Sequence, residues 1–323
     1  MYDIVTIGSA TVDVFVNVSQ NGREFVNAHH HPDVCLPLGA KVLIDDLVMD
    51  TGGGGTNTAV SFARLGFKTG YAGAVADDQN GKHILDILRK EKVTFLGKSK
   101  KGKSGYSVIL MHLKGDRTIL AYKGVNDTLQ TRDVKPIAAT WLYCSSMLGQ
   151  SGETLVKLIE AAKKKGTRVA FNPSLYLAQL GLRKLTPILK HTDVLVLNKE
   201  EAEALLGMNA PIKTLLTKLS EHIPVPVITD GPHGAYATDG GTLFAIHPHH
   251  VPVVETTGAG DAFASGFVAG QLLGKDLPTS LRMGQAQAEG VLSAVGAKNK
   301  LFTRPQLLAE MRKRPHEVTG SAL

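Results

Sequence analysis

The hydrophobic and polar positions of this 323-residue chain change period several times. Short apolar runs, typical of buried strands, alternate with longer stretches in which apolar residues recur every three or four positions, as in helices. From residue 140 onward this alternation is regular, with strands predicted at 141–144, 169–171, 194–197 and 225–229. Such repetition of strand and helix predicts an α/β fold with a doubly wound, mostly parallel sheet and flanking helices.

The first 140 residues add a second pattern. The main pattern continues in strands predicted at 4–8 and 71–75 and in helices at 56–65 and 79–90. In contrast, residues 12–18, 42–50 and 104–123 alternate apolar and polar positions, as exposed antiparallel strands do, and the last forms a hairpin turning at 114–116. We expect one domain of residues 1–323, with a small antiparallel β lid formed by about 12–50 and 104–123.

Composition changes this picture little. Charged residues make up 20% of the chain and hydrophobic residues 43%, as in globular proteins, and no apolar run is long enough to span a bilayer. The N-terminus runs directly into a strand pattern without a signal peptide, so we expect a cytoplasmic protein with no membrane partner. Cys35 and Cys144 lie far apart without a nearby histidine pattern, which indicates neither a disulfide framework nor a zinc site.

The net charge of +7 raises the question of nucleic-acid binding. The lysines, however, fall mostly in short groups, such as 98–103 and 163–165. We therefore expect no nucleic-acid partner. A mild positive field also suits an enzyme whose substrates are polyanionic nucleotides.

The strongest chemical signal lies at residues 255–267, where a glycine turn, a lone acid and a small-residue helix follow one another. Residues 251–254 are predicted to end a strand, and a helix is predicted from 262 onward. Gly258 and Gly260 permit a turn that is closed to residues with a Cβ atom. The amides of 258–261 would then be unpaired at a helix N-terminus, where peptide dipoles attract an anion such as a phosphate.

Asp261 is unexpected among anion-binding amides. It could act as a general base, accepting the proton of an acceptor hydroxyl while the amides hold a phosphoryl group. It could equally be the N-cap of the following helix, a position that aspartate favours. This segment alone supports both interpretations.

A second glycine turn precedes the helix predicted at 56–65. Its four glycines, residues 52–55, would let the backbone approach a ligand closely. The Asn57 amide both donates and accepts hydrogen bonds, as vicinal hydroxyls require, and Asp13 would supply a matching acceptor. Alone, however, a glycine-rich turn before a helix is more often only a turn.

Together, residues 52–66 and 255–267 resemble the two signatures of the ribokinase-like (PfkB) family of carbohydrate and nucleoside kinases. Their order and separation also fit that family. Further family landmarks occur in sequence at 8–13, 115–117, 124–126, 198–201 and 229–234. The resemblance covers essentially the whole chain. It implies an ATP- and Mg²⁺-dependent kinase that transfers the γ-phosphoryl group of ATP to a hydroxyl of a sugar.

The resemblance also implies a role for individual residues. Asp261 aligns with the catalytic base of the family, and the anion hole aligns with Gly258, Ala259 and Gly260. Substrate hydroxyls would be held by Asp13, Gly53, Gly54, Gly55 and Asn57, with Asn126 close to them. These alignments favour catalysis over helix capping for Asp261.

On the nucleotide side, Asn198 and Glu201 match an element that orders Mg²⁺ and the phosphates, mostly through water. The same pair would also suit an ordinary helix start, with Asn198 as N-cap and Glu201 at position N3. The family's nucleotide loop corresponds to Thr229, Gly231 and Gly234, and Gln285 falls near a position that approaches the adenine.

A monovalent cation, K⁺, orders the anion hole in many family members. Its site aligns with Glu255, Thr257 and the backbone after Ser293. Most members have aspartate where this chain has Glu255. The extra methylene could displace the cation or abolish the dependence on it.

Other departures bear on the substrate. Gly54 replaces a lysine that is common in ribokinases, and residues 145–147 lack their sugar-binding glutamate, which argues against a strict ribokinase. The first alternative is a nucleoside kinase, for which Phe15, Tyr106 and Tyr122 are the lid aromatics able to stack on a base. The second is a non-catalytic sugar-binding protein.

The sequence of the predicted lid bears on quaternary structure. The apolar residues within 42–49 would leave one face of the lid uncovered. This pattern indicates either a homodimer that pairs through the lid or a lid that packs on its own body.

Overall fold

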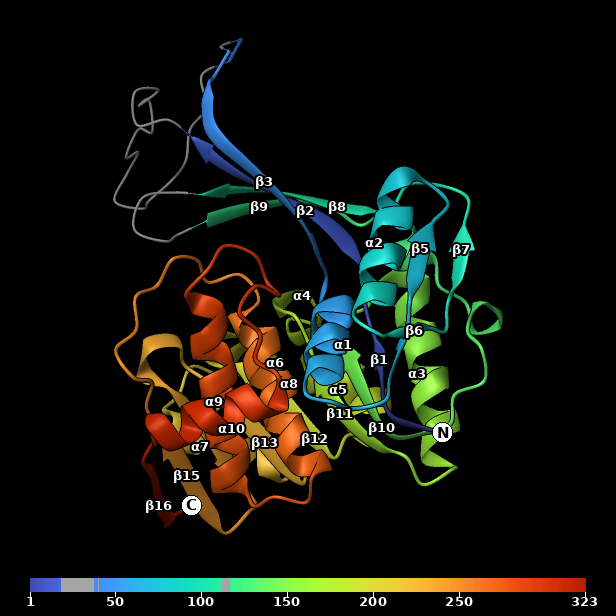
Figure 1. Ribbon diagram of the computed structural model, residues 1–323. Coiled ribbons are helices and arrows are strands. Elements are labelled where there is room, and N and C mark those ends of the chain that lie inside the picture. Colours follow the sequence, from blue (N-terminus) through green and yellow to red (C-terminus); the bar gives the residue numbers. More distant parts are fainter. Residues whose placement is uncertain (19–37, 40, 112–116) are drawn as a thin grey trace.

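The computed structural model describes residues 1–18, 38–39, 41–111 and 117–323. Within these residues, a ten-stranded sheet runs through the body in the order β16-β15-β14-β13-β12-β11-β10-β1-β4-β6 (Figure 1). Its parallel strands are β1 (Tyr2–Ile7), β4 (Thr69–Ala72), β6 (Thr94–Phe95), β10 (Ala139–Ser145), β11 (Arg168–Asn172), β12 (Val194–Asn198) and β13 (Val225–Thr229). Three antiparallel strands continue it: β14 (Ala235–Thr238), β15 (Thr242–Ile246) and β16 (Val318–Ala322). The predicted mostly parallel sheet is confirmed.

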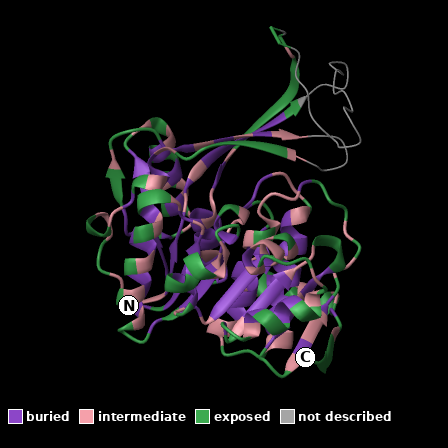
Figure 2. Cartoon of the chain, turned by 180° about the vertical axis from the view of Figure 1, so that it is seen from behind, coloured by how far each residue is buried: buried purple, intermediate pink, exposed green. Residues whose placement is uncertain are grey.

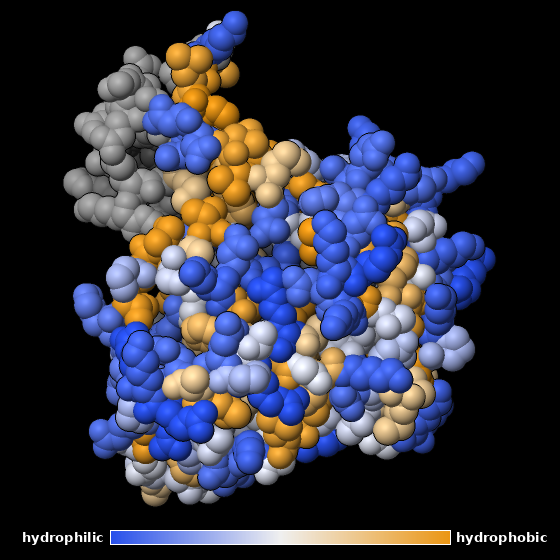
Figure 3. Space-filling model, in the orientation of Figure 1, coloured by the Kyte–Doolittle hydropathy of each residue, from blue (hydrophilic) through white to orange (hydrophobic). Residues whose placement is uncertain are grey.

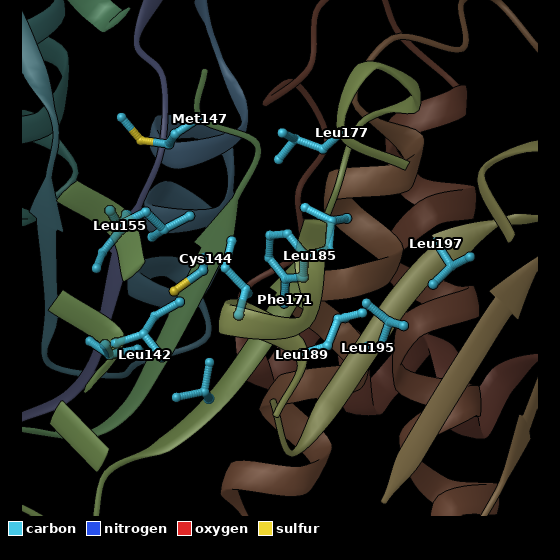
Figure 4. Packing of buried hydrophobic residues seen from close by; sticks show 14 of the residues in the cluster. Leu142, Cys144, Met147, Leu155, Phe171, Leu177, Leu185, Leu189, Leu195 and Leu197 are labelled. Atoms are coloured by element: carbon cyan, nitrogen blue, oxygen red, sulfur yellow. The ribbon is translucent and has the colours of Figure 1, made fainter. Parts of the chain in front are cut away.

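Helices cover both faces of this sheet, because alternate residues of each strand point to opposite faces and both sets are apolar. In β10, Leu142 and Cys144 belong to one buried cluster and Trp141 and Tyr143 to the other. The first cluster contains residues of α3 (Gly149–Lys163), α4 (Leu175–Ala178), α5 (Gly181–Leu189), α6 (Lys199–Leu206) and α7 (Ile212–Ser220) (Figure 4). The second contains residues of α1 (Gly54–Arg64), α8 (Ala259–Leu272), α9 (Leu277–Leu292) and α10 (Arg304–Lys313).

A third buried cluster lies where the lid joins the body, and it includes Ile84 and Leu88 of α2 (Gln79–Lys90). The predicted strand at 71–75 is wrong in one respect, because it is two strands. β4 stays in the main sheet, whereas β5 (Ala74–Ala76) pairs with β7 (Lys98–Lys100). The break falls at Gly73, where an added Cβ would lie 2.0 Å from the Tyr71 hydroxyl.

The segments predicted to form the lid make a second sheet, and the name lid is kept for it. Its described strands are, in order, β3 (Ile44–Gly52), β2 (Thr11–Val18), β8 (Gly105–Met111) and β9 (Arg117–Tyr122). The β2–β3 and β8–β9 pairs are antiparallel, as predicted, but β2 and β8 run parallel, so the sheet is mixed. It projects from the body (Figure 1), and residues at its far end are exposed (Figure 2). The predicted hairpin turn at 114–116 and Cys35 lie outside the described residues.

The lid carries exposed apolar side chains. On β3 they are Ile44, Leu47, Val48 and Met49, and on β9 they are Ile119, Leu120 and Tyr122. Figure 3 shows apolar side chains gathered over the lid on one face of the molecule. The lid therefore does not bury this surface on its own body.

Residues 251–254 form no strand, so that prediction is wrong. Pro248 and Pro252 flank and interrupt this segment and have no amide hydrogen to donate to a ladder. The Val254 amide instead donates to the Leu292 carbonyl oxygen of α9. In the described part of the chain, no helix combines the length and the apolar character needed to cross a membrane.

Candidate active site

The two glycine turns that the sequence singles out lie side by side at the starts of α1 and α8, which pack against each other (Figure 1). Gly53 caps α1 with φ 94°, and Gly258 caps α8 with φ 82°. This left-handed backbone favours glycine at both positions. A Cβ atom on Gly258 would also lie 2.5 Å from the Ala297 Cβ, and one on Gly53 would lie 2.5 Å from the Ser9 carbonyl oxygen.

A direct hydrogen bond connects the two turns. The Asn57 Nδ2 donates to Asp261 Oδ2 across 2.8 Å, although the residues are 204 positions apart. Asp261 occupies position N3 of α8, whose cap is Gly258, so the N-cap interpretation of Asp261 is wrong. Its carboxylate faces the start of α1, where Oδ2 accepts from Asn57 and Oδ1 lies beside Gly54.

The surroundings of Asp261 tune its basicity. Burial raises the pKa of the Asp261 carboxyl, and the negative charge of Asp13 raises it further. The hydrogen bond from Asn57 and the positive charge of Lys298 act in the opposite direction. A carboxylate with a raised pKa is a better proton acceptor, as a general base requires.

Asp13 is buried beside this pair. Burial raises its pKa, while hydrogen bonds from the Thr11 and Ser107 hydroxyls lower it. The Thr11 hydroxyl donates to Asp13 Oδ1 across 2.8 Å. An added Cβ on Gly52 would lie 1.7 Å from Asp13 Oδ2, so the second glycine turn leaves the space that the carboxylate occupies.

Gly54 leaves space beside the Asp261 carboxylate, as Gly52 does for Asp13. A Cβ there would lie 3.0 Å from the Ser145 hydroxyl and 3.5 Å from Asp261 Oδ1. The lysine found at this position in ribokinases would therefore point toward Ser145 and Asp261. The absence of a side chain at Gly54 keeps this side of the carboxylate open.

Lys298 is a site residue that sequence reasoning missed. Its side chain is buried, with Nζ 3.2 Å from Asn57 Oδ1 and 3.8 Å from Asp50 Oδ1. Burial lowers the pKa of this lysine, and the charges of Asp50, Asp13 and Asp261 counteract that effect. The only sequence signal was a lysine directly after Gly296 and Ala297, and exposed Lys300 two positions later makes that signal ambiguous.

Asn126 also lies here, but its amide is bonded to backbone. Oδ1 accepts from the Ala10 amide at 2.9 Å, while Nδ2 donates to the carbonyl oxygens of Ala10 at 2.8 Å and Lys123 at 3.0 Å. Both of its donor hydrogens are thus used to join the start of the lid to residues 123–126. Contact with a substrate hydroxyl remains a prediction for Asn126.

Of the residues predicted to bind the nucleotide, all except Asn198 share one cavity of about 530 Å³. Its lining includes Thr229, Gly231, Gly234 and Gln285, together with Ala259 and Gly260 of the anion turn. Apolar side chains and prolines complete it, among them Pro232, Pro248, Val251, Phe263 and Leu292. The predicted nucleotide loop and the predicted anion-binding turn at 258–260 (the anion turn) therefore line the same cavity.

Asn198 and Glu201 form the capping box that the sequence allowed. Asn198 Oδ1 accepts from the Glu201 amide at 2.8 Å, and Glu201 Oε2 accepts from the Asn198 amide at 2.9 Å. Burial raises the pKa of Glu201 to about 7, and the charges of Glu200 and Asp261 add to this effect. Glu201 Oε1 takes no part in the capping box. The carboxylate of Glu201 and the amide oxygen of Asn198 are hard oxygen donors, which suit Mg²⁺.

Glu255 and Thr257 carry buried oxygens that suit a different cation. Glu255 is buried, and its Oε1 accepts from the Thr257 amide at 2.5 Å. Glu255 Oε2 and Thr257 Oγ1 are buried and have no hydrogen-bond partner among the described residues. Two such oxygens fit a monovalent cation, because buried polar atoms are otherwise costly.

Arg117 of the lid strand β9 reaches this same corner. Its Nε lies 3.9 Å from Glu255 Oε1, and its Nη1 hydrogen-bonds to the Thr256 hydroxyl. The sequence signal for Arg117 was the family landmark at 115–117. The arginine connects the lid to the anion turn and carries a charge that would compete with a cation beside Glu255.

The chain is similar in sequence to known proteins over most of its length. Residues 1–304 match the model of a family described as pfkB family carbohydrate kinase. The chain is 30% identical over 248 residues to an uncharacterized sugar kinase of Archaeoglobus fulgidus, covering 75% of this chain and 98% of that protein. It is 29% identical over 269 residues to a ribokinase of Haemophilus influenzae, covering 80% and 86%.

The fold is also similar to that of a solved adenosine kinase from Sinorhizobium meliloti. The TM-score is 0.82, with 23% sequence identity and coverage of 97% of this chain and 99% of the other. This likeness concerns the fold, which the two chains share over nearly their whole lengths.

Proposed function

Because the chain belongs to the pfkB family of carbohydrate kinases, we propose that it phosphorylates a hydroxyl of a neutral sugar and uses ATP with Mg²⁺ as the donor. As a member of this family it is a kinase, a phosphotransferase acting on a hydroxyl group. The observation that carries the proposal is the 2.8 Å hydrogen bond between Asn57 and Asp261. It joins the turn that would hold the sugar to the turn that would hold the phosphate.

The reaction follows from that juxtaposition. Asp261 accepts the proton of the acceptor hydroxyl as its oxygen attacks the γ-phosphorus. A new P–O bond forms, the bond between the γ-phosphorus and the β–γ bridging oxygen breaks in line, and ADP leaves with that electron pair. The amides of Gly258, Ala259 and Gly260 stabilise the charge on the transferred group. No phosphoenzyme is needed.

The charges around the acceptor favour a neutral sugar over an anionic one. The carboxylates of Asp13, Asp50 and Asp261 act on the buried ammonium group of Lys298, and Arg64 adds one further positive charge nearby. An acid group on the substrate at this point would add to an excess of negative charge. Asp13 and Asn57 offer the acceptors and donors that sugar hydroxyls require.

Two cations belong to the proposal. Asn198 and Glu201 would hold Mg²⁺ through water, and the ion would neutralise charge on the nucleotide phosphates. Glu255 and Thr257 would hold K⁺ beside the anion turn, where it would fix the backbone of that turn. Their orphaned oxygens support this second assignment.

We also propose that the enzyme is a homodimer and that it is located in the cytoplasm. The exposed apolar side chains of β3 and β9 would be covered if two lids paired in a homodimer. We place the enzyme in the cytoplasm, where ATP is available.

A nucleoside kinase is the second candidate, since one feature of the lid favours it. Tyr106 and Tyr122 are cross-strand partners on β8 and β9, and Tyr122 is exposed. Such a pair could stack on a base. Phe15, the third aromatic predicted for this role, is buried in the core and is unavailable for stacking.

An ADP-release assay on a panel of neutral sugars, sugar acids and nucleosides tests the proposal. We expect turnover with a neutral sugar, and turnover lower by about 100-fold or more when Asp261→Asn protein from the same purification replaces the wild type. Turnover only with nucleosides would select the second candidate. No ADP release with any acceptor, despite sugar binding detected by calorimetry, would instead indicate a binding protein.

A further inference from the structure

Two histidines and a glutamate meet beside the nucleotide cavity. His249 comes from the segment after β15, Glu289 from α9, and His316 from the segment between α10 and β16. Glu289 and His316 are buried, whereas the His249 side chain is 27% exposed. Three distant parts of the chain thus converge on one point, and the catalytic proposal uses none of these residues.

The distances within this cluster are short. His249 Nδ1 lies 3.1 Å from Glu289 Oε2, and His316 Nε2 lies 2.8 Å from Glu289 Oε1. The two imidazole rings lie 3.8 Å apart between centroids. One ligand atom from each residue falls within 4.8 Å of the others.

We propose that His249, Glu289 and His316 form a binding site for a transition-metal dication, with Zn²⁺ as the best match. Two imidazole nitrogens and one carboxylate oxygen are a ligand set that zinc accepts, and they leave one position for water. Magnesium and calcium prefer oxygen ligands and fit this set less well. The nitrogen ligands therefore distinguish this site from the Mg²⁺ site proposed at Asn198 and Glu201.

The surroundings hold the carboxylate in place. The His249 amide donates to Glu289 Oε1 at 2.7 Å, and Gln285 Nε2 donates to the same oxygen at 3.2 Å. Both donors act on Oε1 and leave Oε2 directed at the His249 ring. Hydrogen bonds of this kind from neighbouring groups are typical around metal-binding carboxylates.

The site has a route to solvent and a connection to the nucleotide. His249 and Gln285 both line the 530 Å³ cavity. A metal can therefore enter on the partly exposed His249 side. Once bound, it would fix the segment before β16 to α9 and to this wall of the cavity.

The main alternative is a hydrogen-bonded His-Glu-His cluster with no affinity for metal. Titration of the metal-free protein with ZnCl₂ alone, followed by calorimetry and thermal unfolding, separates the two. We expect one zinc ion per chain at this cluster and a rise in the unfolding temperature. Glu289→Gln and His316→Gln should each weaken zinc binding by about 100-fold or more, because the loss of even an outer-shell partner costs about 10- to 100-fold.

Two controls make the titration specific. His250→Gln changes an exposed neighbouring histidine outside the cluster and should leave zinc binding unchanged. Replacing the three histidines at 29–31 with alanine removes another source of zinc binding in this sequence. If this replacement abolishes binding while Glu289→Gln and His316→Gln do not weaken it, the proposed site is wrong.

A further variant covers the case in which the buried substitutions unfold the protein. His249→Gln changes the partly exposed ligand and should preserve the fold while weakening zinc binding. Cobalt(II) added in place of zinc should give the intense visible absorption of a four-coordinate ion in wild type and lose it in His249→Gln. Equal spectra from the two proteins would overturn the proposal.

Discussion

The proposed acceptor side and the proposed nucleotide side of the site consist of different kinds of residue. On the acceptor side, charged and amide side chains converge from distant elements: Asp13, Asn57, Asp261 and Lys298. On the nucleotide side, the cavity is lined mostly by glycines, prolines and apolar side chains. Discrimination among acceptors should therefore depend on a few charges, whereas nucleotide binding should depend on backbone and shape. Single substitutions should be far more damaging on the acceptor side.

The largest effect should come from Asp261→Asn. Asparagine keeps the shape of the side chain and can still contact Asn57, but it cannot accept the hydroxyl proton. We expect kcat to fall by about 10²- to 10⁴-fold. Steady-state kinetics with the acceptor found by the ADP assay will measure this fall. Near-normal turnover with an unchanged circular dichroism spectrum would show that Asp261 is not the base.

Lys298→Met tests the charge balance on the acceptor side. Three carboxylates would lose their shared cation, so the pKa of Asp261 should rise and the acid limb of the kcat/KM profile should move to higher pH. The free energy of unfolding should also fall, by about 3–5 kcal/mol, because buried charges lose their partner.

Lys300→Met is the matched control for this substitution, since Lys300 is exposed. It should change neither the pH profile nor the stability. A merely structural role for Lys298 would lower activity equally at every pH and leave the acid limb in place. Lys298→Arg should restore the acid limb at least in part, and it covers the case in which the methionine variant does not fold.

The contrast between the two sides also explains what the sequence could predict. Asn57 and Asp261 were identified because each lies in or beside a glycine turn, and such turns constrain the backbone locally. Asp13 was identified because it belongs to the family landmark at 8–13. Lys298 was missed because its acidic neighbours come from β2, β3 and α8, and a sequence does not reveal that a lysine is buried among them.

In the fold, too, features set by a local pattern were predicted, whereas features set by distant residues were not. Residues predicted as the α2 helix, 79–90, match the observed element because their apolar period is local and strong. The predicted strand at 251–254 failed because Pro252 interrupts its apolar run. At Gly73 the Tyr71 hydroxyl, which donates to the Gly8 carbonyl oxygen, leaves no room for a Cβ atom, and the sequence does not reveal where that hydroxyl lies. Likewise, the parallel pairing of β2 with β8 joins segments about 90 residues apart and leaves no local pattern.

The anion turn lies between the two sides, and its proposed cation gives an intermediate effect. Replacing K⁺ by tetramethylammonium at constant ionic strength should lower kcat by about tenfold, less than the loss of an anion-hole donor itself. The KM for the acceptor should change little. Equal rates in both salts would contradict a cation at Glu255 and Thr257 and would favour Arg117 as its replacement.

Glu201 should produce a smaller effect, visible in stability. Its pKa in the folded protein, about 7, lies above the ordinary value, so its contribution is full at low pH and is lost as pH rises toward and through 7. Allowing for its partial exposure, we expect metal-free wild type to lose about 1 kcal/mol more than Glu201→Gln between pH 5 and pH 8. Urea denaturation measures the difference. MgCl₂ should reduce the loss in wild type, and identical pH slopes in the two proteins would contradict the assignment.

Gln285→Ala should have the smallest effect and so tests the nucleotide side of the comparison. Gln285 lines the cavity, and removing its amide deletes a single neutral hydrogen-bonding group. The KM for ATP should rise by about two- to tenfold, the equivalent of one such hydrogen bond. Both kcat and the KM for the acceptor should stay the same, because the backbone and the apolar wall still hold the nucleotide. A loss comparable to that of Asp261→Asn would mean that the nucleotide side also depends on one polar side chain, and the distinction between the two sides would fail.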